Sequence, residues 1–171
     1  MELLSEADSR NGDCRNKKWT EEREYREEIM QEVSVIIPNF NGMAYLDGVL
    51  AGLECQSVNN FEVILVDNGS SDGSCAFVAA RYPWVHLIEL PENFGFCKAV
   101  NEGIKASRAP YVLLLNNDIE VTENFIEEMI FAIKRHPKAF SCAARMIQFH
   151  DRDKLDDAGN YYCALGWAYA R

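Results

Sequence analysis

The chain has 171 residues, of which 48% are apolar and 26% are charged, and this is the composition of an ordinary globular protein. The 17 basic and 27 acidic residues give a net charge of −10, which argues against a nucleic-acid partner because nucleic-acid-binding proteins usually present a basic face. Apolar runs such as Tyr111–Leu115 are far shorter than the roughly 20 residues that cross a bilayer, so the sequence predicts one globular domain or at most two.

The chain begins with a charged segment, residues 1–32, that contains few large apolar side chains. Thr20 is a suitable N-cap for a helix through the Glu- and Arg-rich stretch that follows it. We predict a solvated helix or loose arm here, with a helix that docks on a partner or an upstream domain as the alternative. The first residues lack the apolar run of a secretion signal, which predicts a cytoplasmic protein.

From Val33 onward, short apolar runs alternate with stretches of helical apolar spacing. The expected strands cover residues 33–38, 61–66, 85–90, 111–115 and 139–149. The expected helices cover residues 43–55, 72–81, 96–107 and 122–135. This alternation predicts an α/β domain over residues 33–171, built on a mostly parallel sheet with helices on both faces.

Four polar segments that break the regular structure lie where strands end or helices begin, at residues 38–42, 67–72, 91–95 and 116–118. In open parallel sheets, ligands bind outside the carboxyl ends of the strands. The four segments are therefore expected to converge on one edge of the sheet and form the binding site.

The triplet Asn116-Asn117-Asp118 follows the apolar strand at residues 111–115. A single carboxylate beside amides suits a hard divalent cation, Mg²⁺ or Mn²⁺, that takes its other ligands from water and from the diphosphate of a substrate. The alternative is a simple turn at the end of the strand, because both residue types favour turns.

Two other strand ends offer groups that suit a nucleotide base. In the segment Asp67–Asp72, the amide of Asn68 presents a donor and an acceptor side by side, as the imide edge of uracil or thymine requires. Asn39 and Asn41 follow the first strand and could hold a base or a ribose. The alternatives are a capped turn at the first site, with Asp72 as the cap of the next helix, and a plain loop at the second.

The segment from Asn93 to Asn101 places Gly95 in a turn before a helix, with Lys98 one turn into that helix. The free amide groups and positive dipole of a helix start can hold an anion. The glycine fingerprint of dinucleotide-binding domains and the P-loop are both absent from the sequence, so neither a nicotinamide dehydrogenase nor a P-loop enzyme is indicated.

Six cysteines, at positions 14, 55, 75, 97, 142 and 163, form no closely spaced pair, and we expect most of them to be reduced and partly buried. The three histidines are scattered, and the serine elbow of an α/β-hydrolase is absent. A nucleotidyltransferase would need a glycine-rich basic loop after the first strand, and residues 38–42 contain neither Lys nor Arg.

Taken together, the chain resembles the family 2 glycosyltransferases from Val33 to about Gly166. The resemblance rests on four motifs in order, at residues 33–42, 61–72, 93–103 and 111–118. The Asn-Asn-Asp triplet, together with the Val-Asp-Asn-Gly-Ser-Ser-Asp run, is most similar to the rhamnosyltransferase-type branch. The resemblance implies a Rossmann-like GT-A fold that binds a nucleotide-sugar.

The resemblance also implies roles for single residues. Those expected around the base and ribose are Pro38, Asn39, Asn41, Asp67 and Asn68. Those expected to shape the rest of the donor pocket are Asn93, Gly95, Lys98, Asn101 and Asn117. Asp118 is the expected ligand of the divalent metal, Mn²⁺ or Mg²⁺, and Asn116 and Asn117 stand where the acidic form of the family motif has carboxylates.

The implied reaction is inverting transfer of a sugar from a UDP- or dTDP-sugar to a glycan or other acceptor, with a carboxylate as the general base. In the family, that base and the acceptor half follow the stretch resembled by Leu155–Asn160. We therefore expect a chain cut off before its acceptor half, with no general base assigned and with self-association through an exposed edge near Tyr161–Tyr169.

The resemblance further implies polysaccharide synthesis at the inner face of a membrane. The alternative function is a non-catalytic nucleotide- or partner-binding module that keeps the pocket without turnover. A turnover assay would separate this alternative from the transferase.

Overall fold

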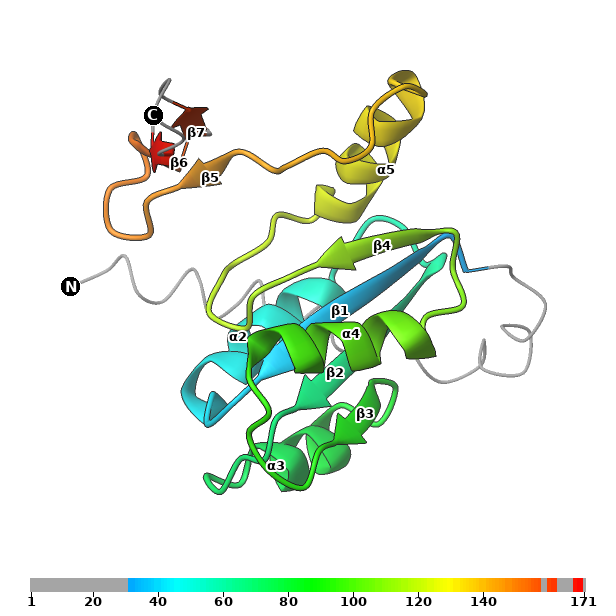
Figure 1. Ribbon diagram of the computed structural model, residues 1–171, viewed down its shortest axis with the longest axis vertical. Coiled ribbons are helices and arrows are strands. Elements are labelled where there is room, and N and C mark those ends of the chain that lie inside the picture. Colours follow the sequence, from blue (N-terminus) through cyan, green and yellow to red (C-terminus); the bar gives the residue numbers. More distant parts are fainter. Residues whose placement is uncertain (1–30, 158–159, 163–167, 171) are drawn as a thin grey trace. The chain divides into compact units, whose positions relative to one another are not determined.

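The computed structural model describes residues 31–157, 160–162 and 168–170 (Figure 1). The expected N-terminal arm lies outside the described residues except for its last two positions, and so do Cys14, Cys163 and much of the edge expected near Tyr161–Tyr169. The chain divides into two compact units, residues 1–127 and residues 128–171. The first unit contains the converging polar segments.

The first unit is built on a four-stranded sheet in which every neighbouring pair is parallel. Its strands are β1 (Val33–Asn39), β2 (Phe61–Asp67), β3 (His86–Glu89) and β4 (Tyr111–Leu114). Their order in the sheet is β3-β2-β1-β4, so the chain steps outward from β1 to β3 and then crosses back to β4. The expected parallel α/β sheet is confirmed.

The helices connect successive strands and cover both faces of this sheet. They are α2 (Met43–Glu54), α3 (Ser74–Arg81) and α4 (Phe96–Ala106), and α5 (Phe125–Arg135) follows β4. Because parallel crossovers are right-handed, reversing the direction of travel after β3 places α4 on the face opposite α2 and α3. Figure 1 shows α4 in front of β1 and β2, with α2 behind them.

The core lies in two layers, one on each side of the sheet. The α2 side chains that are buried are those at helical spacing, Leu46, Val49, Leu50 and Leu53. On the other face, Ala99 of α4 packs with Ile64 and Val66 of β2. Each layer removes aliphatic surface from water at about 25 cal/mol per Å², which anchors the strand ends that carry the site.

Pro38 is in the central strand β1, where a proline would ordinarily break the hydrogen-bond ladder. The backbone hydrogen-bonding groups of Ile36 point toward β4, because its carbonyl oxygen accepts from Leu115 N at 3.0 Å. Alternate residues of a parallel strand face the same neighbour, so Pro38 faces the β4 side as well. Pairing of β1 with β4 ends at Ile36, and the missing N–H of Pro38 therefore leaves no gap in the ladder.

The second unit contains the end of α5 and four short strands. Met146–Ile147 (β5) pairs antiparallel with Leu155–Asp157 (β6), and Asn160–Tyr162 (β7) pairs antiparallel with Ala168–Ala170 (β8). The prediction of a strand over residues 139–149 is wrong except at β5. A strand persists only where a neighbour accepts its backbone hydrogen bonds, and β6 pairs with two residues of this segment.

No helix among the described residues is long and apolar enough to cross a membrane.

Candidate functional site

The register of the parallel strands brings three of the polar strand ends together. Asn39, the last residue of β1, is paired with Asp67, the last residue of β2. Asn68 N then donates to Asn39 O at 2.8 Å, so the two chains stay joined just beyond the sheet. β4 ends three residues before Asn117, which places this amide level with the end of β1.

A chain of hydrogen bonds crosses the carboxyl edge of the sheet. Asn117 Nδ2 donates to Asn39 Oδ1 at 2.8 Å, and Asn39 Nδ2 donates to Asp67 Oδ1 at 2.8 Å. Asn39 and Asp67 are each only 2% exposed. Because an ionised carboxylate only accepts hydrogen bonds, Asp67 fixes which way the amide of Asn39 faces, and Asn39 in turn fixes the amide of Asn117.

Gly42 lies directly under this chain of amides. A Cβ atom at position 42 would overlap Asn117 Nδ2 and Asn39 Oδ1. Only a glycine lets the start of α2 approach the Asn39–Asn117 bond so closely. The same residue is the N-cap of α2, and it has no side chain with which to cap the helix.

Asp72 supplies that cap from the neighbouring loop. Met43 N donates to Asp72 Oδ2 at 2.9 Å, while Ser74 N donates to Asp72 Oδ1 at 3.0 Å and the Ser74 hydroxyl donates to the same oxygen. The hydrogen bond from the Ser74 hydroxyl is the main cause that holds the pKa of Asp72 below its usual value, and the backbone N–H groups add to it. Asp72 stands one residue before Gly73, the N-cap of α3, and its carboxylate binds the first N–H of that helix as well as the first N–H of α2.

Asn41 is a second link, after Asp72, between the β1–α2 loop and the β2–α3 loop. Its backbone adopts a left-handed conformation, with φ of 49°, which asparagine tolerates better than most residues. Asn41 N donates to Ser70 Oγ at 2.8 Å, and Ser71 N donates to Asn41 Oδ1 at 2.9 Å. The β1–α2 loop and the β2–α3 loop thus form one hydrogen-bonded structure.

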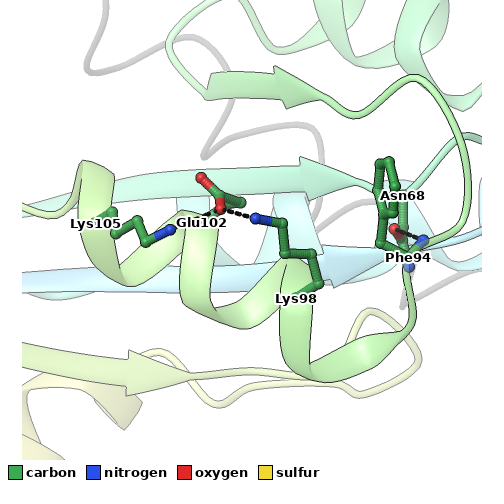
Figure 2. A network of polar contacts seen from close by, with 5 residues as sticks. All are labelled: Asn68, Phe94, Lys98, Glu102 and Lys105. Carbon is green, nitrogen blue, oxygen red and sulfur yellow. Dashed lines mark hydrogen bonds and ion pairs between the residues drawn. The ribbon is translucent and has the colours of Figure 1, made fainter.

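Asn68 connects β2 to the third loop, which precedes α4 (Figure 2). Asn68 Oδ1 accepts from Phe94 N at 3.0 Å, and Asn68 Nδ2 donates to Asn93 Oδ1 at 2.9 Å. Asn93 Oδ1 also accepts from Gly95 N at 2.9 Å, which shapes the turn into α4. At Gly69, where φ is +78°, a Cβ atom would lie 2.7 Å from the backbone of Glu92, so this close approach requires a glycine.

Lys98 and Asn101 are on α4 and do not join the network of strand ends in the described part of the chain. Lys98 Nζ contacts Glu102 Oε1 at 2.6 Å, and Lys105 Nζ contacts the same oxygen at 2.9 Å (Figure 2). Hydrogen bonds from Lys98 and then Lys105 lower the pKa of Glu102 to about 2. Asn101 is exposed on the same helix.

The cysteines of the described residues are reduced, as expected, but the expected burial is only half right. Cys55 and Cys75 are partly buried, whereas Cys97 of α4 and Cys142, in an irregular segment, are exposed. Burial, followed by hydrogen bonding with Asp67 and Glu89, raises the pKa of the Cys75 thiol to about 12. Cys75 is therefore a neutral thiol beside the site at physiological pH.

The carboxylate expected to bind metal, Asp118, is exposed just beyond the buried Leu115, with exposed Asn116 and half-buried Asn117 before it. The described residues contain no group of three or more His, Cys, Asp or Glu side chains that could hold a metal by themselves. This donor set fits a cation that shares its coordination with water and with a substrate diphosphate, and it does not fit a zinc site made of protein ligands alone.

Sequence reasoning missed Ser70, and it assigned Asp72 to one helix only. Ser70 bridges Asp67, Asn39 and Asn41 through its hydroxyl group. The signal was present in the Asp-Asn-Gly-Ser-Ser-Asp run, because short polar side chains in a loop commonly bond to backbone groups. Which distant backbone they reach depends on the packing of β1 against β2.

Comparison with known proteins gives a consistent picture. Residues 34–168 match the model of the family described as glycosyl transferase family 2. The chain is 29% identical over 133 residues to glycosyltransferase GlyG of Streptococcus pneumoniae serotype 4, a match that covers 76% of this chain and 39% of GlyG. It is 27% identical over 121 residues to cholesterol galactosyltransferase of Borreliella burgdorferi, covering 69% of this chain and 34% of that protein.

Among solved structures, the chain is similar to S. aureus TarS 1–349 in crystals with UDP and with UDP-GlcNAc. Both comparisons give a TM-score of 0.57 and 26% identity and cover 62% of this chain, with 33% and 32% of the TarS chain matched, respectively. The chain therefore spans about two fifths or less of the length of these relatives.

Proposed function

Because the chain belongs to glycosyl transferase family 2, we propose that it binds the nucleotide diphosphate of a sugar donor at the carboxyl ends of β1, β2 and β4. The observation that carries this proposal is the buried chain of hydrogen bonds from Asn117 through Asn39 to Asp67, which joins the three strand ends into one preformed edge. The similarity to TarS, which was crystallised with UDP and UDP-GlcNAc, supports it.

In this proposal, the base and ribose lie against the β1–α2 and β2–α3 loops. Pro38 and the backbone around Asn41 line the pocket. Asp67 and Asn68 bind the base with the acceptor and donor groups that are not used in their hydrogen bonds within the protein. Asn39 acts from beneath by fixing Asp67. The amide of Asn68 would pair with the imide edge of uracil or thymine, so the donor class in this proposal is a UDP- or dTDP-sugar.

The diphosphate lies between the start of α4 and the end of β4 in the same proposal. Asn93 and Gly95 shape the turn into α4, and the first N–H groups of that helix face the diphosphate, with Lys98 and Asn101 on the first turns of the same helix. Asn117 is placed at the ribose or diphosphate. Lys98 would first have to leave Glu102, to which Lys105 remains bound.

Asp118 would hold Mn²⁺ or Mg²⁺ together with the diphosphate oxygens. When bound, such a cation stabilises negative charge on the leaving diphosphate. The contribution of this chain is to place one exposed carboxylate directly after two amides, Asn116 and Asn117, where the acidic form of the family motif has carboxylates. The amides at positions 116 and 117 favour a site in which the substrate supplies several of the ligands.

The proposed reaction is inverting sugar transfer to a glycan or other hydroxyl acceptor. The acceptor oxygen forms a bond to the anomeric carbon, the bond from that carbon to the diphosphate oxygen breaks, and the hydroxyl proton passes to a carboxylate base. We assign no residue of this chain to that base. Activity, acceptor and any role in polysaccharide synthesis belong to this proposal.

Calorimetric titration of the purified chain with UDP, dTDP and GDP, each with and without Mn²⁺, tests the proposal. We expect binding of UDP or dTDP that strengthens with Mn²⁺, and at least a tenfold loss of the Mn²⁺-dependent affinity in Asp118→Ala, about 1.4 kcal/mol. Glu123→Ala, which removes an exposed carboxylate five residues further on, is the matched control and should bind normally.

Failure of the folded wild-type chain to bind any diphosphate would contradict the proposal. The alternative of a partner-binding module without a nucleotide would then lead. Binding without turnover, when donor and a panel of glycan acceptors are supplied, would favour a non-catalytic nucleotide-binding module.

A further inference from the structure

Ser70 joins the two loops of the site through several hydrogen bonds that no sequence motif predicted. It lies in the β2–α3 loop, and its hydroxyl donates to Asp67 Oδ1 at 2.6 Å. The same oxygen accepts from Asn41 N at 2.8 Å and from Asn39 Nδ2 at 3.3 Å. Its backbone N donates to the other carboxylate oxygen, Asp67 Oδ2, at 2.8 Å.

These contacts use the whole hydrogen-bonding capacity of the hydroxyl group. A serine hydroxyl has one hydrogen to donate and two lone pairs that accept. The hydrogen goes to Asp67, and the lone pairs go to Asn41 and Asn39. No position is left for a ligand, so Ser70 can act on a bound nucleotide only through the residues that it holds.

We propose that Ser70 is a positioning residue of the nucleotide site. It orients the carboxylate of Asp67 from one side and the left-handed backbone of Asn41 from the other, and so couples the two loops between which the base lies. The inference rests on the proposed function for the position of the base. Its structural part, the coupling of the loops, is independent of any ligand.

Removing the hydroxyl should loosen both loops without unfolding the domain. In Ser70→Ala, the N–H of Asn41 loses its acceptor and the left-handed turn loses one of its two side-chain anchors. Asp67 keeps the bonds from Asn39 Nδ2 and Ser70 N but loses the bond from the Ser70 hydroxyl, which is shorter than either of them. Hydrogen bonds to ionised groups are the stronger class, so we expect about tenfold weaker nucleotide binding.

The first test compares Ser70→Ala, Ser70→Thr and Ser57→Ala by titration with uridine and with UDP in Mn²⁺. Ser57→Ala is a matched control because it also removes a hydroxyl bonded to a carboxylate, at 2.8 Å from Glu127 Oε2 and outside the site. Ser70→Ala should weaken uridine and UDP by the same factor, since it acts at the base. Ser70→Thr restores the hydroxyl and should restore affinity, and Ser57→Ala should bind as the wild type.

The second test needs no ligand and follows amide hydrogen exchange by NMR. In Ser70→Ala, exchange of the Asn41 amide should become faster, whereas the Met43 amide, which is bonded to Asp72, should keep its protection. Unchanged exchange at Asn41, or wild-type nucleotide affinity in Ser70→Ala, would overturn the inference. If the wild-type chain itself bound no nucleotide, the proposed function would fail, and the exchange measurement alone would decide whether Ser70 couples the loops.

Discussion

Polar side chains at the strand ends are mostly bonded to one another. Asn39 uses its amide for Asp67, Ser70 and Asn117, and Asn68 uses its amide for Phe94 and Asn93. A buried polar network of this kind has few alternative arrangements, because each unpaired group would carry the full cost of desolvation. The edge is therefore arranged before any ligand arrives.

The carboxylate of Asp72 stabilises the folded chain by an amount that depends on pH. Its folded pKa lies below the ordinary value of 3.8, so its stabilising contribution is complete above that value and is lost as the pH falls through the folded pKa. Asp72→Asn removes the charge and replaces one of the two accepting oxygens by a donor, so it should lower the free energy of unfolding by about 1 kcal/mol at pH 7. Urea unfolding at pH 7 and at pH 3 measures this difference.

The difference between the wild type and Asp72→Asn should shrink at pH 3, because this pH lies below the ordinary pKa of 3.8, so the carboxyl group of the unfolded chain takes up a proton and part of the advantage of the folded carboxylate is lost. An equal difference at both pH values would show that the charge of Asp72 contributes nothing. Ser57→Ala, which removes no ionisable group, controls for the general effect of acid.

At the scale of elements, one buried amide holds the end of α2 to the start of α5. Gln56 is 1% exposed, and its Nε2 donates to Gly52 O at 3.0 Å and to Thr122 O at 2.8 Å. Its Oε1 accepts from Ile126 N at 2.9 Å, which serves as a cap for the first turn of α5. The segment between β4 and α5, which contains Asn116–Asp118, is thereby held at its α5 end.

Gln56→Ala should destabilise the domain by about 2–4 kcal/mol, because it leaves the N–H of buried Ile126 without its acceptor, removes the donor to the Gly52 and Thr122 carbonyl groups, and creates a small cavity. Equilibrium unfolding in urea measures the loss, and Ser57→Ala, at an exposed neighbouring position, should change the free energy of unfolding by less than about 1 kcal/mol. A loss for Gln56→Ala no larger than that of Ser57→Ala would contradict the bridging role.

For the molecule as a whole, the net charge of −10 opposes the binding of an anion. The lysine on the first turns of α4 is already paired with Glu102, so it offers the diphosphate little uncompensated charge. A bound divalent cation would be the largest local positive charge and would reverse this balance.

Comparison of uridine with UDP isolates this effect of charge. Without metal, UDP should bind no more tightly than uridine, because its two phosphates add negative charge to an acidic protein. With Mn²⁺, UDP should bind at least about tenfold more tightly than uridine, or 1.4 kcal/mol, while uridine is unaffected. Tighter binding of UDP without metal would show that the amides and α4 suffice to hold the diphosphate.

The sequence alone determined the α/β class, the four parallel strands, the helices between them and the family resemblance. These follow from local patterns: β-branched runs such as Val33–Ile37, helical apolar spacing, and polar turns placed directly after strands. It also predicted that the polar strand ends meet at one edge of the sheet, because parallel strands bring their carboxyl ends together. The strand expected at residues 139–149 formed only at β5, because an apolar run does not specify a pairing partner.

Tertiary structure alone decided which polar groups meet. Asn117 and Asn39 are 78 residues apart, and Asn39 and Asp67 are 28 apart, so no local pattern could show that one amide is bonded between the other two groups. The second role of Asp72, as the cap of α2, and the coupling by Ser70 also arise from the register of β1 with β2. Local sequence fixes which hydrogen bonds a side chain can make, and the packing of strands fixes which partner it finds.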